Sequence, residues 1–156
     1  MRKDLEAIAA ALHARHATDE EIVALRRHAQ AVAASASTAE QLKDKEYSIV
    51  HAAMGELYKK WPDKRTAFRS CEEKTLRDMK LVMRYCLYSA VLDDPDYAKD
   101  RMLFWFRTIL NAFEFGHEFI EDAYRMAQKR VNQQLGKSEA ESISYMIDES
   151  IAVFNG

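Results

Sequence analysis

Apolar residues recur at every third or fourth position along almost the whole chain, which is the spacing of one face of an α-helix. Four pairs have the spacing of a capping box, a serine or threonine followed three residues later by glutamate: Thr18 with Glu21, Ser37 with Glu40, Ser70 with Glu73 and Ser138 with Glu141. Pro62 and Gly116 are predicted to end helices. The predicted helices cover roughly residues 3–16, 18–33, 37–61, 71–92, 96–114, 117–134 and 138–154.

The chain is expected to be all-α and to form one domain over residues 1–156. Four glycines and two prolines in 156 residues are too few for the many turns of an all-β chain. The last five predicted helices suit a globin-like fold, in which helices pack at steep angles. The first two are expected to form a hairpin over residues 3–33, ahead of that core.

Composition and motifs exclude several classes of function. A net charge of −2 argues against a nucleic-acid partner, and no apolar run approaches the length of a membrane span. The N-terminus lacks the continuous apolar core of a signal peptide, so a cytoplasmic location is expected. Two cysteines make neither a disulfide framework nor a zinc site. No phosphate loop or nucleophile elbow occurs, so the chain is not expected to be an enzyme.

The helix predicted over residues 71–92 carries the candidate binding residues. Arg77, Arg84 and Tyr88 are seven and four residues apart and therefore share one helix face. Asp78 lies beside that stripe, and Thr75 precedes it by three residues. Such a face can hold a polar ligand, although most charge patterns of this kind are solvated surfaces with salt bridges.

The segment KTLRDMKLVMRYCLY resembles the chromophore helix of the phycobiliproteins, the allophycocyanin and phycocyanin group. That helix reads roughly Cys-x-Arg-Asp, then an arginine six residues after the aspartate and a tyrosine four residues later. Upstream, LYKKWPD, ending at Asp63, is similar to the family's Phe-x-Lys-Arg-Pro-Asp segment. Residues 18–61 and 96–154 fit the family's remaining helices in length and order.

The resemblance implies a bilin, an open-chain tetrapyrrole, as cofactor. Asp78 would accept hydrogen bonds from the central pyrrole nitrogens, Arg77 and Arg84 would pair with the propionates, and Tyr88 would line the pocket. The resemblance also implies an oligomer in which the hairpin over residues 3–33 packs against a second phycobiliprotein-like subunit, the same chain or a different one. Two amphipathic helices outside a core must bury their apolar stripes somewhere.

The chain departs from the family at the attachment cysteine, which stands three residues before the aspartate. Thr75 occupies that position, and its hydroxyl cannot form the usual thioether. Cys71 lies one helical turn earlier, at the predicted first position of the helix, where the helix dipole favours the nucleophilic thiolate. A bilin displaced by one turn would meet Cys71, and this linkage ranks below non-covalent binding because the displacement strains the contact with Asp78.

Two functions follow from these observations. The first is a chromoprotein that binds a bilin, without the usual thioether, for light harvesting or light sensing. The alternative is a chromophore-free relative that acts as a regulatory or scaffold protein through its interfaces, which the missing cysteine favours. The sequence leaves two interpretations of Trp105 open. A tryptophan at helical spacing belongs either to the core or to the wall of a flat tetrapyrrole pocket.

Overall fold

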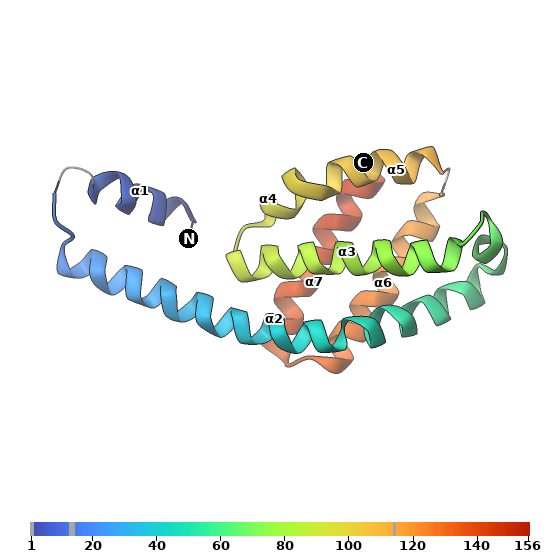
Figure 1. Ribbon diagram of the computed structural model, residues 1–156, viewed down its shortest axis with the longest axis horizontal. Coiled ribbons are helices and arrows are strands. Elements are labelled where there is room, and N and C mark those ends of the chain that lie inside the picture. Colours follow the sequence, from blue (N-terminus) through green and yellow to red (C-terminus); the bar gives the residue numbers. More distant parts are fainter. Residues whose placement is uncertain (1, 13–14, 114) are drawn as a thin grey trace.

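The computed structural model describes residues 2–12, 15–113 and 115–156, and every regular element in these ranges is a helix. The all-α prediction is therefore confirmed. In chain order the elements are α1 (Arg2–Leu12), α2 (Asp19–Lys60), the 3-10 helix η1 (Pro62–Thr66), α3 (Cys71–Leu92), α4 (Pro95–Ala98), the π-helix η2 (Lys99–Leu103), α5 (Phe104–Ala112), α6 (His117–Gln134) and α7 (Lys137–Asn155) (Figure 1).

The core lies where two pairs of helices cross. Figure 1 shows α3 running beside the second half of α2, with α6 and α7 crossing behind them at steep angles. Steep crossings are the packing expected of a globin-like fold, so this prediction is also confirmed. The largest fully buried side chains come mainly from these helices and are Ile49, Leu57, Met83, Leu103, Ile143, Ile147 and Phe154.

The prediction of a break at Ser37 is wrong, because α2 is a single helix of 42 residues. Residues 19–54 contain neither glycine nor proline, so no residue in this stretch interrupts the backbone hydrogen bonds. The alanines around Ser37 favour helix strongly enough to outweigh the modest cost of a serine in a helix interior. The stop before Pro62 is confirmed, since α2 ends at Lys60 with Trp61 as its C-cap.

The capping box predicted at Thr18 forms, whereas those predicted at Ser70 and Ser138 do not. The Thr18 hydroxyl accepts the Glu21 N–H at 3.3 Å, and the Glu21 carboxylate accepts the Thr18 N–H at 2.9 Å. Ser70 instead has a left-handed backbone with φ of 58° and makes no capping hydrogen bond. The last helix begins at Lys137 after Gly136, so Ser138 lies inside it and is not its cap.

The carboxyl group of Glu21 is expected to titrate far below its usual value near 4.5. Hydrogen bonds from Arg15 at 2.6 Å and from the Thr18 N–H lower the pKa of Glu21 to about 2. A pKa lowered by folding means that the stabilisation of the helix start is present above about pH 4.5 and is lost as the pH falls towards 2. An NMR titration of the Glu21 carboxyl carbon measures this midpoint. A midpoint near 4.5 for Glu21 would contradict the prediction.

The single helix predicted over residues 96–114 is divided into three pieces. Pro95 begins α4, and the Asp94 side chain caps it by accepting the Asp96 N–H at 3.2 Å. The π-helical turn η2 follows and continues directly into α5, which ends at Ala112. Glu114, the predicted last residue, lies outside the described residues. The wider turn at η2 changes the phase of the helix, and so it sets the direction in which the side chains of α5 point.

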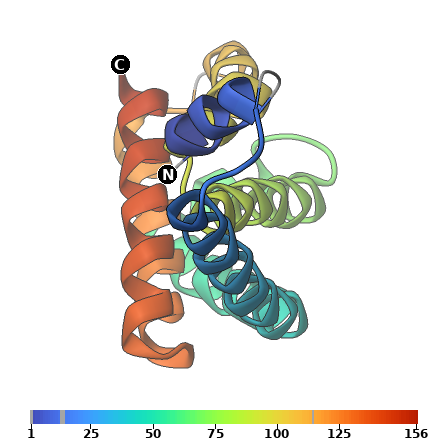
Figure 2. The same cartoon turned by 90° about the vertical axis from the view of Figure 1, so that its left-hand side faces the viewer.

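The N-terminal hairpin projects from the core. Figures 1 and 2 show α1 folded back along the first part of α2, away from α6. The second helix of the hairpin is not a separate element, because it is the first half of α2. The predicted first helix extended to His16; α1 ends at Leu12, and His13 and Ala14 lie outside the described residues.

The hairpin leaves apolar side chains in contact with solvent. Among the described side chains between residues 6 and 33, none is buried. Ile22 and Val23 are 41 % and 47 % exposed. No helix in the described ranges combines the length and hydropathy that crossing a bilayer requires.

Candidate functional site

Three of the six candidate residues line one cavity of about 460 Å³ between α3, α5 and α6. Thr75, Arg77 and Asp78 lie on its α3 side. We call it the aromatic cavity, because its other walls carry seven aromatic side chains: Phe68, Trp105, Phe106, Phe113, Phe115, Phe119 and Tyr124. Its size falls within the range of small-molecule sites, which combine apolar walls with a few polar groups.

The polar groups of the aromatic cavity gather along the first turns of α3. The Arg77 Nε donates a hydrogen bond of 2.8 Å to the Asp78 carboxylate. The Arg77 side chain is 72 % exposed and that of Asp78 is 26 % exposed, so the arginine lies at the mouth and the carboxylate deeper. Lys74 also lines the cavity, with its ammonium 5.1 Å from the centre of the Phe68 ring. Among the described residues, the cavity thus has one carboxylate and two cations at one edge of an apolar space.

Thr75 of α3 accepts a hydrogen bond from a buried tyrosine of α2. The Tyr58 hydroxyl donates to the Thr75 oxygen at 3.0 Å, and burial raises the pKa of Tyr58 to about 12, so this donor keeps its proton. Cys71 is 2 % exposed and its thiol donates to the Lys64 carbonyl at 3.2 Å. Cys71 is at the first position of α3, as the sequence predicts. It is not among the described residues that line the aromatic cavity.

Arg84 and Tyr88 lie elsewhere, in a second cavity of about 300 Å³ between α2 and α3. The Arg84 Nε donates to the Glu46 carboxylate of α2 at 3.0 Å. Arg77 and Arg84 do share a helix face, but seven residues place them about 10 Å apart along the axis. Arg77 borders the cavity that α3 forms with α5 and α6, whereas Arg84 borders the cavity that α3 forms with α2. The structure therefore does not bring the six candidate residues together.

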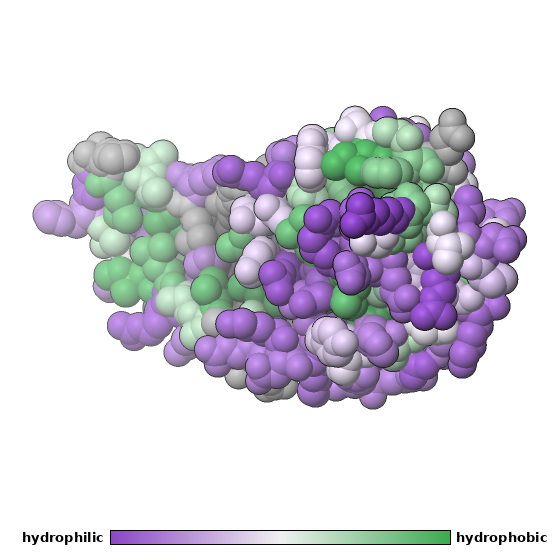
Figure 3. Space-filling model, turned by 45° about the vertical axis from the view of Figure 1, so that its right-hand side comes forward, coloured by the Kyte–Doolittle hydropathy of each residue, from purple (hydrophilic) through white to green (hydrophobic). Residues whose placement is uncertain are grey.

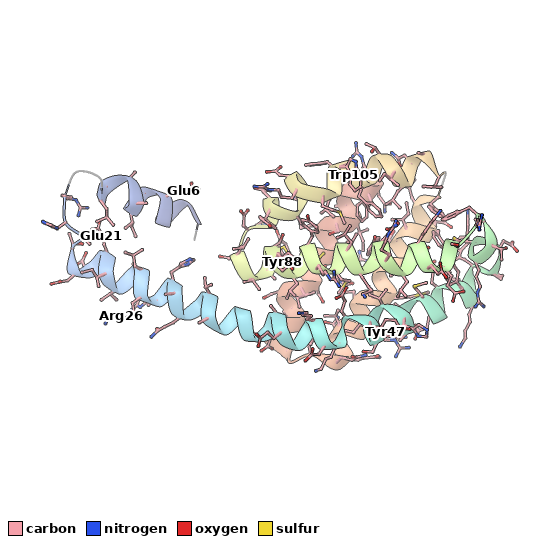
Figure 4. All side chains as sticks on the ribbon, in the orientation of Figure 1. Glu6, Glu21, Arg26, Tyr47, Tyr88 and Trp105 are labelled. Carbon is pink, nitrogen blue, oxygen red and sulfur yellow. The ribbon has the colours of Figure 1, made fainter. Side chains whose placement is uncertain are left out.

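The position of Trp105 favours the interpretation that it belongs to the wall of the aromatic cavity and not to the core. Its side chain is 61 % exposed, and it lines the aromatic cavity. Figure 4 shows Trp105 on α5, whereas Tyr88 lies near the end of α3 that faces the hairpin. Figure 3 shows apolar side chains gathered over the edge formed by α5. Phe104 and Phe113 of this region are each 50 % exposed.

Three residues that contribute to these cavities were not singled out from the sequence. Phe68 lies in the connection before α3, where no periodic pattern applies. Lys74 is one of several lysines near the candidate motif and carries no distinguishing signal. Glu46 does carry a distinguishing signal in the sequence. This charged residue stands three and four positions before the buried residues Ile49 and Val50 and thus interrupts an apolar stripe.

Comparisons with known proteins agree with the fold. The chain matches the family model described as Phycobilisome protein over residues 7–153, which is well over half of its length. A search of curated proteins gives no significant match. Within the described ranges, no group of three or more histidine, cysteine, aspartate or glutamate side chains is arranged to hold a metal ion.

Proposed function

Because the chain belongs to the phycobilisome protein family, we propose that it is a chromoprotein that binds a bilin non-covalently in the aromatic cavity, for light harvesting or light sensing. Proteins of this family generally carry bilin chromophores and are not enzymes. The observation that carries the proposal is the carboxylate of Asp78 beside an apolar space of about 460 Å³ with aromatic walls. A bilin has a flat conjugated body, central N–H donors and two carboxylate side chains.

The residues of the cavity match these three features. The aromatic walls cover a flat apolar body and exclude water from it. The Asp78 carboxylate accepts hydrogen bonds from N–H groups, and its exposed neighbour Arg77 donates to a propionate. Lys74 supplies a second cation for the other propionate. Arg84 lies outside this cavity and donates from its Nε to Glu46, so the proposal assigns no propionate to it.

Attachment is proposed to be non-covalent. Thr75 replaces the cysteine at the position of the usual linkage, and its oxygen accepts the hydrogen bond from Tyr58. Cys71, the first residue of α3, is buried, and its thiol donates a hydrogen bond to the Lys64 carbonyl. Neither residue offers an accessible thiolate to a vinyl group of a bilin.

The test is to express the chain together with a haem oxygenase and a bilin reductase and to record its visible spectrum. A purified protein with a red absorption band supports the proposal. Loss of the pigment from the polypeptide on a zinc-stained gel after denaturation in acid urea supports the non-covalent form. Fluorescence that remains with the band, and disappears in Cys71→Ala, would instead establish the displaced covalent linkage.

A chromophore-free regulatory or scaffold protein is the second candidate function. It is favoured by the replacement of the attachment cysteine by Thr75 and by the apolar side chains exposed on the hairpin. On this hypothesis the hairpin binds another phycobiliprotein-like subunit without pigment. A protein that stays colourless after co-expression, yet forms oligomers, supports this function and contradicts bilin binding.

A further inference from the structure

Tyr124 of α6 is a buried tyrosine whose hydroxyl has no partner among the described residues. Tyr124 is 3 % exposed and lines the aromatic cavity. Burial raises the pKa of Tyr124 well above its usual value, and the nearby Cys86 and Asp78 raise it further, so the hydroxyl keeps its proton. Buried Tyr58 donates to Thr75, whereas the Tyr124 hydroxyl makes no hydrogen bond within the described ranges. A buried tyrosine hydroxyl usually has a partner, so a missing one calls for an explanation.

The Tyr124 hydroxyl is open to the aromatic cavity. Within the described ranges, three buried side-chain atoms are sealed from water and lack a partner, and they belong to His28, Glu46 and Arg130. The Tyr124 oxygen also lacks a partner but is not one of these sealed atoms, so a water-sized group can reach it. The aromatic cavity is the space that Tyr124 borders, and the hydroxyl therefore faces this cavity.

The ring that carries this hydroxyl is fixed by the core. It lies against the ring of Phe154, with 5.2 Å between the ring centres, and Phe154 is fully buried. Phe106, a wall residue of the aromatic cavity, packs edge-on against the same Phe154 ring at 5.8 Å. A ring held by packed neighbours presents its hydroxyl at one place, as a preorganised binding group requires.

The Tyr124 hydroxyl is a neutral donor in an apolar wall. The other α6 residues at the cavity are Phe119, Ile120 and Ala123, so this hydroxyl is the polar side-chain group that α6 contributes. A carboxylate would lose its hydration at this wall without gaining a cation, and an N–H group finds a stronger acceptor in Asp78. The group that matches the hydroxyl is a neutral carbonyl oxygen, which can only accept.

We propose that Tyr124 donates a hydrogen bond to a lactam carbonyl at one end of the bilin. A bilin offers such a group at each end, because both terminal rings are lactams. Asp78 of α3 then holds the central nitrogens, and Tyr124 of α6 holds a terminal ring. The inference rests on the proposed bilin binding and extends it, because it assigns the α6 wall to one end of the pigment. The carbonyl is conjugated with the rest of the bilin, so the contact also affects the colour.

The test is a fluorescence titration of the full chain with biliverdin, comparing the wild type with Tyr124→Phe, which removes a single oxygen atom. The variant is expected to bind biliverdin about tenfold more weakly. In resonance Raman spectra it is expected to raise the frequency of one lactam C=O stretch, because a hydrogen bond to a carbonyl lowers that frequency. Tyr145→Phe is the matched control, since Tyr145 lies exposed on α7 and does not line the aromatic cavity. It is expected to change neither measurement.

Thermal unfolding of the pigment-free protein separates ligand binding from a structural role. Tyr124→Phe is expected to keep or raise the unfolding midpoint, because the hydroxyl has no protein partner to lose. Tyr58→Phe is expected to lower it, because that variant loses the hydrogen bond to Thr75. Equal loss of stability in both variants would reveal an internal partner of Tyr124 and overturn the inference.

The titration also distinguishes this inference from the proposed function. If Tyr124→Phe binds biliverdin with the affinity and the carbonyl frequencies of the wild type, the contact with Tyr124 is wrong and pigment binding stands. If the wild type itself binds no biliverdin and stays colourless after co-expression with a bilin reductase, both are wrong.

Discussion

Replacing Asp78 by asparagine is expected to shift the red absorption band of the bilin complex to the blue, to broaden it and to weaken binding. The carboxylate accepts hydrogen bonds from the pyrrole nitrogens and favours their protonated form, whereas the neutral amide does not. Loss of a hydrogen bond to a charged group costs about 1.5–3 kcal/mol, which corresponds to roughly 10–100-fold in affinity. The measurements are the visible spectrum and a bilin titration by fluorescence.

Two variants bring out the role of Asp78. Asp148→Asn is the matched control, because Asp148 is on the surface, bonded to Arg125, and does not line the aromatic cavity. It is expected to leave the spectrum unchanged. Arg77→Ala is expected to weaken binding with little change of colour, since a propionate lies outside the conjugated system. An Asp78→Asn complex with the spectrum and affinity of the wild type would remove Asp78 from the site.

Introducing a charge on the hairpin is expected to dissociate the oligomer. Ile22 is 41 % exposed on the first turns of α2, and the proposed subunit contact covers it. Ile22→Asp would bury a carboxylate without a partner, and unpaired buried charges in interfaces cost several kcal/mol. The dissociation constant is therefore expected to rise by at least about 100-fold. Light scattering at micromolar protein concentration measures the mass.

Ala24→Asp is the control for this experiment. Ala24 is two residues further along α2, so its side chain points about 200° away from that of Ile22. The control adds the same charge to the same turn and is expected to keep the mass of the wild type. A wild-type chain that is already monomeric at micromolar concentration would count decisively against self-association through the hairpin.

The architecture could be predicted from the sequence because it rests on repeated local signals. The stripe of Ile143, Ile147, Ile151 and Phe154, for example, identifies the buried face of α7, and all four side chains are buried. The break predicted at Ser37 failed because a cap is recognised from only two residues, whereas helix formation depends on the whole surrounding stretch. The capping box predicted at Ser70 does not form for a related reason, since the left-handed backbone of Ser70 does not place its hydroxyl over the helix start.

The candidate site was less predictable because it depends on the neighbours of α3. A helical wheel shows that Arg77 and Arg84 share a face, but it holds no information on which helix lies opposite each of them. The pairing of Arg84 with Glu46 joins residues 38 positions apart in the chain and arises only from the packing of α2 on α3. The exposure of Trp105 depends likewise on the phase of α5 after the π-helical turn.

The unbroken α2 has a mechanical consequence. Its 42 residues form a rod about 63 Å long, at about 1.5 Å per residue, which carries the hairpin at one end and the wall beside α3 at the other. A continuous helix bends only gently and offers no hinge at which the hairpin can swivel. A subunit fixed to the hairpin therefore has a defined tilt relative to the aromatic cavity. For two pigment-bearing subunits joined in this way, the rod would set both the spacing and the mutual angle of their transition dipoles, the two quantities on which resonance transfer of excitation depends.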